Sequence, residues 1–332
     1  MNSLLESFLK SLSRDEGFGK DNLLLVPIYR HAEYAARHYL LLGEAREERC
    51  FKISEVNEQG SVNTLLVENK CEKDVLILDG EELIGSKQNR MVNATILVPG
   101  KSTLNIPVSC VERGRWGYNS SDFKPSDAFG YSELRRQKTS QVSASLSFNQ
   151  TFSSNQGEVW DEIDRKHRSV GSKSDTDAMH EVYQHLKVEL GEFVKGMSPK
   201  ENQIGIAVFI NGYFNCMDVF SHPEVLVRMW NKLLTSYAME AVELGKHGKK
   251  RETPESIDAI MEELLKSETS EFSSVGQGVA LRIKGKDLVG AALMADENFL
   301  HMALFQSQDD APGEETYTRP SRRRDSMDHY GV

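Results

Sequence analysis

The stretch QIGIAVFINGYFNCMDVF, which runs from Gln203 to Phe220, sets the architecture of the C-terminal half. Two apolar runs flank Asn211-Gly212. This dipeptide is the strongest short signal for a two-residue β-hairpin turn, because both residues tolerate positive φ angles. We therefore predict an antiparallel hairpin here, with one strand on either side of the turn.

Helical patterns surround the predicted hairpin. Apolar residues recur at the spacing of one helical face in four segments. Pro223 and Pro254 fall in the first turn of two of these segments, where a missing N–H costs nothing. After the last helix, three short apolar runs between residues 276 and 305 predict three strands. The helical faces are expected at residues 159–170, 179–193, 223–245 and 254–265.

The N-terminal part of the chain has a different pattern. Residues 1–12 and 34–49 predict helices, and NLLLVPIY (residues 22–29) predicts a strand. From Cys50 on, short β-branched runs alternate with turn signals, which is typical of an antiparallel sandwich or barrel-like unit. The predicted fold class is α+β, with a β-rich antiparallel N-terminal unit followed by a mixed helix-and-hairpin C-terminal unit.

Composition divides the chain into five segments. A serine-rich segment with little periodicity separates the two units, and we expect it to be a long loop. The last segment has almost no apolar residues and includes RPSRRRDS, so we expect a disordered, solvated tail. The alternative is that its arginines form a docking site for a protein partner or a modification site. The segments are an N-terminal helix (1–21), the β-rich unit with polar signature motifs (22–118), the serine-rich loop (119–157), the α+β unit (158–306) and the tail (307–332).

The composition also excludes classes of protein. The formal net charge of −10 argues against nucleic acid as a partner, since surfaces that bind nucleic acid are basic. No apolar run reaches the ~18 residues needed to span a bilayer, and the N-terminus lacks the parts of a signal peptide. We therefore expect a cytoplasmic protein without membrane association.

Cysteines and common motifs identify no metal site and no cofactor. The four cysteines are scattered without C-x-x-C spacing, and Cys71 and Cys110 lie in or beside strand-like segments, where a free cysteine behaves as a small apolar residue. The chain lacks a Walker-type loop, G-x-S-x-G, G-x-G-x-x-G and H-E-x-x-H. His301, on the apolar run FLHMALF, is expected to be a hydrogen-bonded core residue rather than a ligand or base.

A first polar motif, DGEELIGSKQNR, occupies Asp79 to Arg90 directly after a buried strand-like run. Asp79-Gly80 predicts a two-residue hairpin turn. Strand alternation then places Gln88 and Arg90 on one face, where the guanidinium suits a carboxylate or phosphate and the amide suits a hydroxyl or a base edge. The alternative is a charged hairpin rim whose ion pairs contribute ~0–1 kcal/mol each.

A second polar motif, NIPVSCVERGRWGY, spans residues 105–118. Glu112 shares a strand face with apolar residues, so its carboxylate needs a partner such as Arg90 or Arg115. Trp116 offers a face for stacking on a planar ring, and the neighbouring arginine suits an anion. The alternative is an ion pair in the core that the tryptophan covers.

The stretches DGEELIGSKQNRMVN and IPVSCVERGRW resemble a bacterial and archaeal family named for its association with ADP-ribosylglycohydrolase and rhodanese-phosphatase proteins. Shorter stretches extend the similarity over most of residues 22–305. The resemblance implies work around ADP-ribose or related nucleotides, in stress or conflict settings. It places the polar signature of the family on Asp79, Glu81, Glu82, Lys87, Gln88, Asn89, Arg90, Asn93, Glu112, Arg115 and Trp116.

The residues and the resemblance together leave three functions open, so the sequence does not settle whether the protein is an enzyme. We expect the first function, which is the binding of a nucleotide or ADP-ribose-like small anion by Lys87, Gln88, Asn89, Arg90, Asn93, Arg115 and Trp116. This function requires the two motifs to meet around a shared cavity that is partly shielded from water. The second is a hydrolase for an ADP-ribosyl or related substrate, with Glu81, Glu82 or Glu112 as general acid or base. The third is a non-catalytic scaffold.

Overall fold

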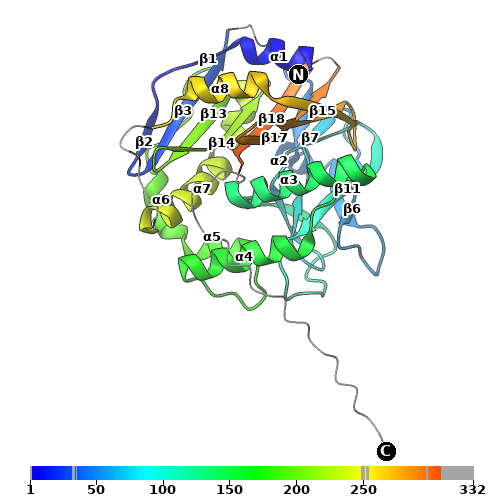
Figure 1. Cartoon of the computed structure of the whole chain (residues 1–332). Coiled ribbons are helices and arrows are strands. Elements are labelled where there is room, and N and C mark those ends of the chain that lie inside the picture. The colour runs from blue at the N-terminus through cyan, green and yellow to red at the C-terminus, as the bar shows by residue number, and fades with distance from the viewer. Residues whose placement is uncertain are drawn as a thin grey trace, which may run out of the picture.

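The fold is given by a computed structural model that describes residues 2–31, 34, 36–247, 251, 254–296 and 298–307 (Figure 1). Within these residues the chain forms eight helices and eighteen strands, which build a nine-, a six- and a three-stranded sheet. Strand pairing is antiparallel except between β4 and β7. The β-rich α+β class that the sequence predicts is confirmed.

Helices and strands follow one another irregularly along the chain. The helices are α1 (Ser3–Lys10), α2 (Leu42–Glu47), α3 (Ser132–Asn149), α4 (Gln156–Val170), α5 (Met179–His185), α6 (Lys187–Val194), α7 (Pro223–His247) and α8 (Ile257–Lys266). The strands are β1 (Leu12–Arg14), β2 (Phe18–Lys20), β3 (Leu23–Arg30), β4 (Tyr39–Leu41), β5 (Phe51–Glu55), β6 (Thr64–Asn69), β7 (Asp74–Ile77), β8 (Glu81–Gly85), β9 (Arg90–Val92), β10 (Ile96–Val98), β11 (Ser102–Cys110), β12 (Phe123–Phe129), β13 (Gly205–Ile210), β14 (Tyr213–Phe220), β15 (Glu268–Ser273), β16 (Val279–Lys284), β17 (Leu288–Ala295) and β18 (Asn298–Gln306).

The nine-stranded sheet contains the predicted hairpin near its centre. Its order is β1-β3-β13-β14-β18-β17-β16-β15, and β2 also pairs with β3. Strands β13 and β14 are joined by Asn211 and Gly212, whose φ angles are 54° and 82°. The hairpin is therefore confirmed, as are the three strands predicted between residues 276 and 305.

Strand alternation gives this sheet two apolar faces. Side chains such as Leu5 of α1 and Leu264 of α8 pack on one face, together with Met302 of β18. Helix α7 packs on the other face through residues such as Leu233 and Tyr237. Figure 1 shows α1 and α8 above the sheet and α7 and α3 below it. The sheet is therefore the middle layer of three.

The two smaller sheets make up most of the N-terminal β-rich unit. Their orders are β12-β8-β9-β11-β6-β5 and β10-β7-β4. Side chains from both sheets share one apolar core, which includes Ile53, Val67, Ile77 and Val98. One strand of the predicted unit of residues 22–118 lies outside these two sheets, because β3 pairs with β13 in the large sheet.

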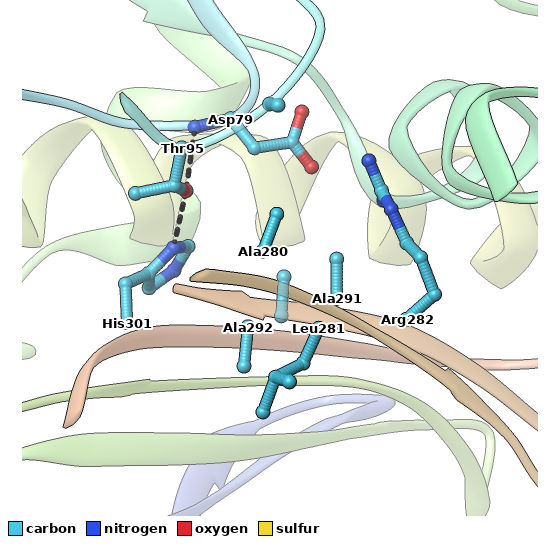
Figure 2. A pocket seen from close by; sticks show the side chains of 10 residues that line it. Asp79, Thr95, Ala280, Leu281, Arg282, Ala291, Ala292 and His301 are labelled. Carbon is cyan, nitrogen blue, oxygen red and sulfur yellow. Dashed lines mark hydrogen bonds between the residues drawn. The ribbon is translucent and has the colours of Figure 1, made fainter. Parts of the chain in front are cut away.

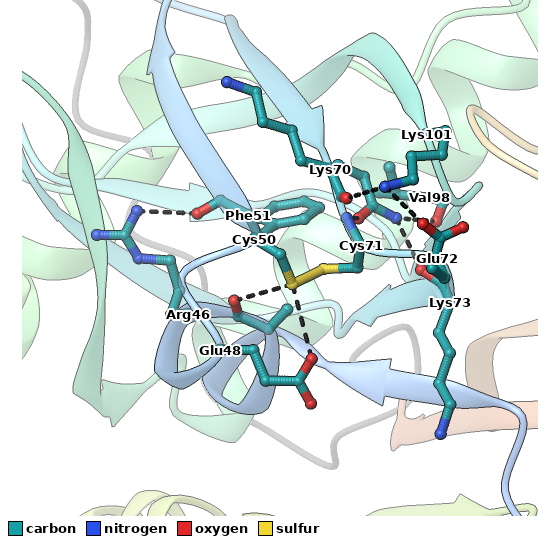
Figure 3. Close-up of a disulfide and its surroundings, with 12 residues drawn as sticks. Arg46, Glu48, Cys50, Phe51, Lys70, Cys71, Glu72, Lys73, Val98 and Lys101 are labelled. Carbon is teal, nitrogen blue, oxygen red and sulfur yellow. Dashed lines mark hydrogen bonds and ion pairs between the residues drawn. A yellow bond between two sulfur atoms is a disulfide. The ribbon is translucent and has the colours of Figure 1, made fainter.

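Cys50 and Cys71 form a disulfide beside the paired strands β5 and β6 (Figure 3). The antiparallel register places Phe51 opposite Asn69, which brings the two cysteines together with 5.0 Å between their Cα atoms. The prediction that Cys71 is a free cysteine that packs like a small apolar residue is therefore wrong. The register of the strands brings Cys71 close to Cys50, and the spacing of the cysteines in the sequence does not reveal this. Cys110 is free and buried.

Two local predictions in this unit are wrong. Asp79-Gly80 does not close a hairpin, because β7 pairs with β4 and β10 whereas β8 pairs with β9 and β12. The turn instead passes the chain from one sheet to the other, with Gly80 at a φ of 95°. Residues 34–49 are expected as a helix, but among those that the structure describes only α2 is helical, because β4 precedes it and pairs in parallel with β7.

The serine-rich segment 119–157 is a further correction, since it forms β12 and the 18-residue helix α3 rather than a loop. The buried side of α3 has helical spacing, but Arg135, Lys138 and Thr139 lie on it among the apolar residues. Apolar periodicity misses such a face, because its central members are polar. The two charged residues are paired with carboxylates of other elements.

Two predictions remain for the rest of the chain. The helical face expected at residues 179–193 is divided at Leu186 between α5 and α6. The predicted tail lies outside the described residues apart from Ser307. None of the helices in the described part of the chain combines the length and the apolar character needed to cross a membrane.

Candidate functional site

The two polar motifs meet where β9 pairs with β11. Arg90 lies opposite Cys110 in this register, so the residues that precede β9 approach those that follow β11. Together they form the arginine cluster. Its polar members are mostly buried, whereas its tryptophan is 50% exposed. The cluster consists of Lys87, Gln88, Asn89, Arg90, Glu112, Arg115 and Trp116.

Glu112 is the central acceptor of the arginine cluster. Arg115 donates from Nε to Oε1 at 2.9 Å and from Nη2 to Oε2 at 2.6 Å. The backbone N–H of Asn89 and the hydroxyl of Thr176 donate to the same carboxylate, at 2.9 and 3.0 Å. Burial alone would raise the pKa of Glu112, but these donors hold it below its ordinary value. The Glu112 carboxylate is therefore ionised, and it accepts its hydrogen bonds from other groups of the protein.

Arg90 is completely buried, and its two Nη atoms have partners within the protein, whereas its Nε is buried without a hydrogen bond. Nη1 donates to the backbone and side-chain oxygens of Gln88, at 3.0 and 3.3 Å, and Nη2 lies 3.9 Å from a carboxylate oxygen of Glu55. The ring of Trp116 lies 5.7 Å from the guanidinium carbon and 5.4 Å from the Lys87 ammonium. The two motifs therefore converge, and their polar groups are directed at one another.

The three candidate acids have separate partners. Glu81 lies 3.9 Å from Lys232 of α7, and Glu82 lies 3.5 Å from His180 of α5. Glu112 is bound within the arginine cluster. Burial raises the pKa of Glu81 above its ordinary value. The paired carboxylates of a glycosidase-like site need a shared substrate between them, and these three side chains face different elements.

Asp79 and Asn93 lie apart from the arginine cluster. Asn93 donates to the backbone carbonyl of Phe152, at 3.1 Å. The carboxylate of Asp79 is paired with the ammonium of Lys138 from α3, and both side chains are almost completely buried. The backbone N–H of Asp79 donates to the hydroxyl of Thr95, at 3.1 Å. The start of the first motif is thus tied to the helix that the sequence did not predict.

A buried polar network continues from Asp79 into the large sheet. The hydroxyl of Thr95 lies 2.7 Å from His301 Nδ1, and His301 Nε2 lies 3.3 Å from Asp218. Arg135 and Tyr237 donate to the same aspartate. Burial lowers the pKa of His301, so a neutral ring joins the two polar neighbours. The network consists of Asp79, Thr95, Arg135, Lys138, Asp218, Tyr237 and His301.

The sequence interpretation of His301 as a hydrogen-bonded core residue agrees with these contacts, but the rest of the network was missed. Arg135 and Lys138 lie in the segment predicted as a loop. Asp218 stands within the apolar strand run of the central hairpin, and Arg282 stands in the middle of β16. A charged residue inside an otherwise buried strand is rare, so the position of these two residues in the sequence was the pattern that could have indicated a buried polar network.

A cleft of about 450 Å³ opens beside the N-terminus of α7. Its lining comes from α1, the end of β3, the segment before β4, and the turn between β17 and β18. The volume lies within the range of small-molecule sites. We call this cavity the α7 cleft, and its principal side chains are Phe8, Arg30, Tyr34, Arg37, Ser221 and His222.

The two arginines of the α7 cleft differ in their partners. Arg37 donates two hydrogen bonds to the carboxylate of Glu44, at 2.7 and 2.6 Å. The Nε of both arginines is buried without a hydrogen bond, but Arg30, unlike Arg37, has no carboxylate partner among the described residues. Its guanidinium carbon lies 5.4 Å from the ring centroid of Phe8. Arg30 is therefore the cation in this cleft that is available to an anion.

No metal centre is formed by the described residues, since they contain no group of three His, Cys, Asp or Glu side chains placed to hold an ion. The acids of the arginine cluster and of the buried polar network are bonded to arginine or lysine instead.

Comparison with known proteins gives a family. A model of the ARG and Rhodanese-Phosphatase-superfamily-associated Protein domain matches residues 11–305. The chain belongs to this family. Searches of curated proteins and of solved structures found no match. The matched range contains both polar motifs and the buried polar network, so these features belong to the family domain.

Proposed function

We propose that this member of the family binds a nucleotide or ADP-ribose-like anion in the α7 cleft. The observation that supports this most directly is one cavity of about 450 Å³ that combines aromatic rings with Arg30, an arginine without a carboxylate partner among the described residues. A nucleotide requires both features, because its phosphate is anionic and its base is planar. Small-molecule sites have volumes of roughly 300–1,000 Å³.

Each part of such a ligand has a counterpart in the lining of the cleft. Arg30 presents a rigid fork of donors that suits phosphate. Tyr34 and Phe299 offer rings on which a base can stack. Asp74 and Asp296 line the same cavity, and carboxylates accept hydrogen bonds from ribose hydroxyls. The acidic residues therefore select for a ligand with a sugar over a bare phosphate.

Helix α7 adds electrostatic support for an anion. It begins at Pro223, and Ser221 and His222 line the cleft directly before it. The positive end of the helix dipole attracts anions. Pro223 has no N–H, and the N–H groups of the next two residues are already bonded to His222, so the support comes from the dipole. The hydroxyl of Ser221 lies 2.9 Å from the hydroxyl of Tyr39, which fixes one side of this opening.

The arginine cluster has a supporting role in this proposal, because its charged groups are bonded to one another. The choice of an ADP-ribose-like ligand, and of a stress or conflict pathway, rests on the resemblance to proteins associated with ADP-ribosylglycohydrolase. The acids named for the hydrolase alternative, Glu81, Glu82 and Glu112, have separate partners and share no space. Binding without turnover is the function that the cleft supports best.

The proposal is tested by calorimetry and thermal shift with ADP-ribose, ADP, NAD and adenosine. ADP-ribose is expected to raise the Tm by several degrees, because a ligand that binds only the folded state stabilises it by mass action. Adenosine, which has no phosphate, is expected to have little effect. Arg30→Gln should weaken ADP-ribose binding by roughly tenfold or more, since a hydrogen bond to a charged group contributes about 1.5–3 kcal/mol.

The matched control is Arg14→Gln, which removes an arginine of β1 that is paired with Asp258 and does not line the α7 cleft. This variant should bind ADP-ribose as the unmodified protein does. If none of the four compounds shifts the Tm, or if Arg30→Gln binds with unchanged affinity, the proposed site is wrong. Turnover of ADP-ribose would favour the hydrolase alternative.

A further inference from the structure

Two further cavities lie beside the large sheet, and they differ greatly in size. The first lies where the first polar motif meets β16, β17 and β18, and Figure 2 shows Asp79 and Arg282 on the same side of its alanine-lined floor. Its volume of about 10 Å³ corresponds to one water molecule. A carboxylate and a guanidinium already line this space, so it has no room for a larger ligand.

The second is an open groove of about 890 Å³ that shares Arg30 and Tyr34 with the α7 cleft. Its other residues come from β1 and the position after it, from the end of β3, and from the turn before β13. The groove and the α7 cleft therefore meet at the two shared residues. We call it the β1 groove, and the residues that it does not share with the α7 cleft include Ser13, Asp15, Tyr29, His31, Glu201 and Asn202.

The local structure fixes the backbone where the two cavities meet. Arg30 at the end of β3 lies opposite Leu12 of β1, and the hydroxyl of Tyr34 donates to the backbone carbonyl of Arg30 at 3.2 Å. Among the described residues the two Nη groups of Arg30 have no hydrogen-bond partner. A guanidinium with two such groups can bind both phosphates of a diphosphate. A diphosphate bound there has one end toward each cavity.

The linings of the two cavities suit different chemical groups. The α7 cleft contains aromatic rings such as those of Phe8 and Phe299. The β1 groove contains the carboxylates of Asp15 and Glu201 and the amide of Asn202. Carboxylates accept hydrogen bonds from hydroxyls, and an amide both donates and accepts. A planar base therefore suits the α7 cleft, and a sugar with several hydroxyls suits the β1 groove.

We propose that the ligand is a nucleoside diphosphate joined to a second sugar, with its base in the α7 cleft, its diphosphate at Arg30 and the second sugar in the β1 groove. This assignment rests on the proposed function and narrows the class of ligand, because a mononucleotide occupies only one of the two cavities. A nucleoside triphosphate is disfavoured, since its third phosphate approaches the carboxylates of Asp15 and Glu201 and like charges repel.

Calorimetry of the whole chain with ADP, ATP and ADP-ribose tests this assignment. ADP-ribose should bind roughly tenfold more tightly than ADP, because its second sugar forms hydrogen bonds with charged groups of the groove. ATP should bind more weakly than ADP-ribose. Equal affinities for ADP and ADP-ribose overturn the assignment and leave the proposed function intact, whereas failure of all three compounds to bind overturns both.

Variants of the two acids assign the additional affinity to the β1 groove. Asp15 and Glu201 are exposed, so truncating either side chain should leave the fold stable. Asp15→Ala and Glu201→Ala should each weaken ADP-ribose binding severalfold and leave the affinity for ADP unchanged, whereas Arg30→Gln should weaken the binding of both. If both alanine variants bind ADP-ribose as tightly as the unmodified protein, the second sugar does not lie in the groove and the assignment is wrong.

The matched control is Asp161→Ala, which removes an exposed carboxylate of α4 that lines neither cavity. This variant should bind ADP and ADP-ribose as the unmodified protein does. Arg14 also lines the β1 groove, but its guanidinium is paired with Asp258 of α8, so Arg14→Gln remains a control for the ligand. A loss of ADP-ribose affinity in Asp161→Ala equal to that in Glu201→Ala would show a general effect of charge and would overturn the assignment.

Discussion

Arg135 and Asp218 form a two-fold hydrogen-bonded ion pair inside the protein, with N–O distances of 2.9 and 2.6 Å. Arg135 belongs to α3 and Asp218 to β14, so the pair joins this helix to the central hairpin of the large sheet. One turn further along α3, Lys138 is paired with Asp79 of the first polar motif. Helix α3 therefore links the two halves of the chain through buried charges.

The first prediction is that Arg135→Met strongly destabilises the protein. The substitution leaves Asp218 buried without its cationic partner, which typically costs about 3–5 kcal/mol. The free energy of unfolding is measured by urea denaturation. Arg168→Met is the control, because Arg168 pairs with Asp164 on the exposed side of α4 and its loss should cost less than about 1 kcal/mol. Equal losses in the two variants would contradict the prediction.

The second prediction concerns the pH dependence of stability. The contact of His180 with Glu82 raises the pKa of the histidine above its ordinary value of 6.5, although partial burial opposes this. A raised pKa in the folded state means that the protonated ring stabilises the fold below pH 6.5 and that this contribution is lost as the pH rises through the folded-state pKa. The free energy of unfolding should therefore fall as the pH rises from 6.5 through the raised folded-state pKa.

His180→Gln should flatten this part of the stability profile, which is measured by urea denaturation at a series of pH values. Glu82→Gln should flatten it in the same way, because it removes the partner that raises the pKa. The double variant should add no further change. A slope that persists unchanged in His180→Gln would show that another group is responsible.

The third prediction concerns the disulfide between Cys50 and Cys71, which are separated by 21 residues. Closing a loop of this length stabilises a protein by roughly 3 kcal/mol in the chain-entropy treatment. The double substitution to serine should lower the free energy of unfolding by about this amount under oxidising conditions. With dithiothreitol present, the unmodified protein and the variant should have nearly equal stability. A difference that persists in reductant would be due to packing.

This disulfide also bears on where the protein resides. Disulfides persist mainly in oxidising compartments and are rare in the cytosol. The pair therefore weighs against the cytoplasmic location expected from the sequence. Thiol labelling of freshly lysed cells, before and after reduction, would measure which state the two cysteines have in the producing organism.

The sequence predicted the fold where the decisive information is local. The turn at Asn211-Gly212 and the apolar periods of α4 and α7 identify their elements within a few residues. The prediction from sequence failed where the fold depends on pairing between strands that are far apart in the chain. The chain passes from one sheet to another at Gly80, and no local residue pattern indicates this. Helix α3 was missed for a different reason, since Arg135 and Lys138 occupy its buried side and interrupt the apolar pattern.

The same difference between local and distant information decides how much of the candidate site could be predicted. Strand alternation and the need of Glu112 for a partner were enough to predict that the two polar motifs meet. The α7 cleft could not be predicted, because Arg30, His222 and Phe299 come from distant parts of the chain and none stands in a recognisable motif. Arg282 carried a signal, a charge within a buried strand, but its significance depends on which other charges surround it.

The last prediction separates a supporting role of the arginine cluster from a binding role. Arg90→Met removes the cation between Gln88 and Glu55, and loss of one partner from a buried charged contact costs about 3 kcal/mol or more. If the cluster supports the fold, this variant should unfold at lower urea concentration, while its folded fraction binds ADP-ribose with unchanged affinity. Arg113→Met is the control from the second motif, because this exposed side chain should contribute less than about 1 kcal/mol. If Arg90→Met keeps its stability and loses ADP-ribose binding, the ligand contacts the motif, and the α7 cleft is not the site.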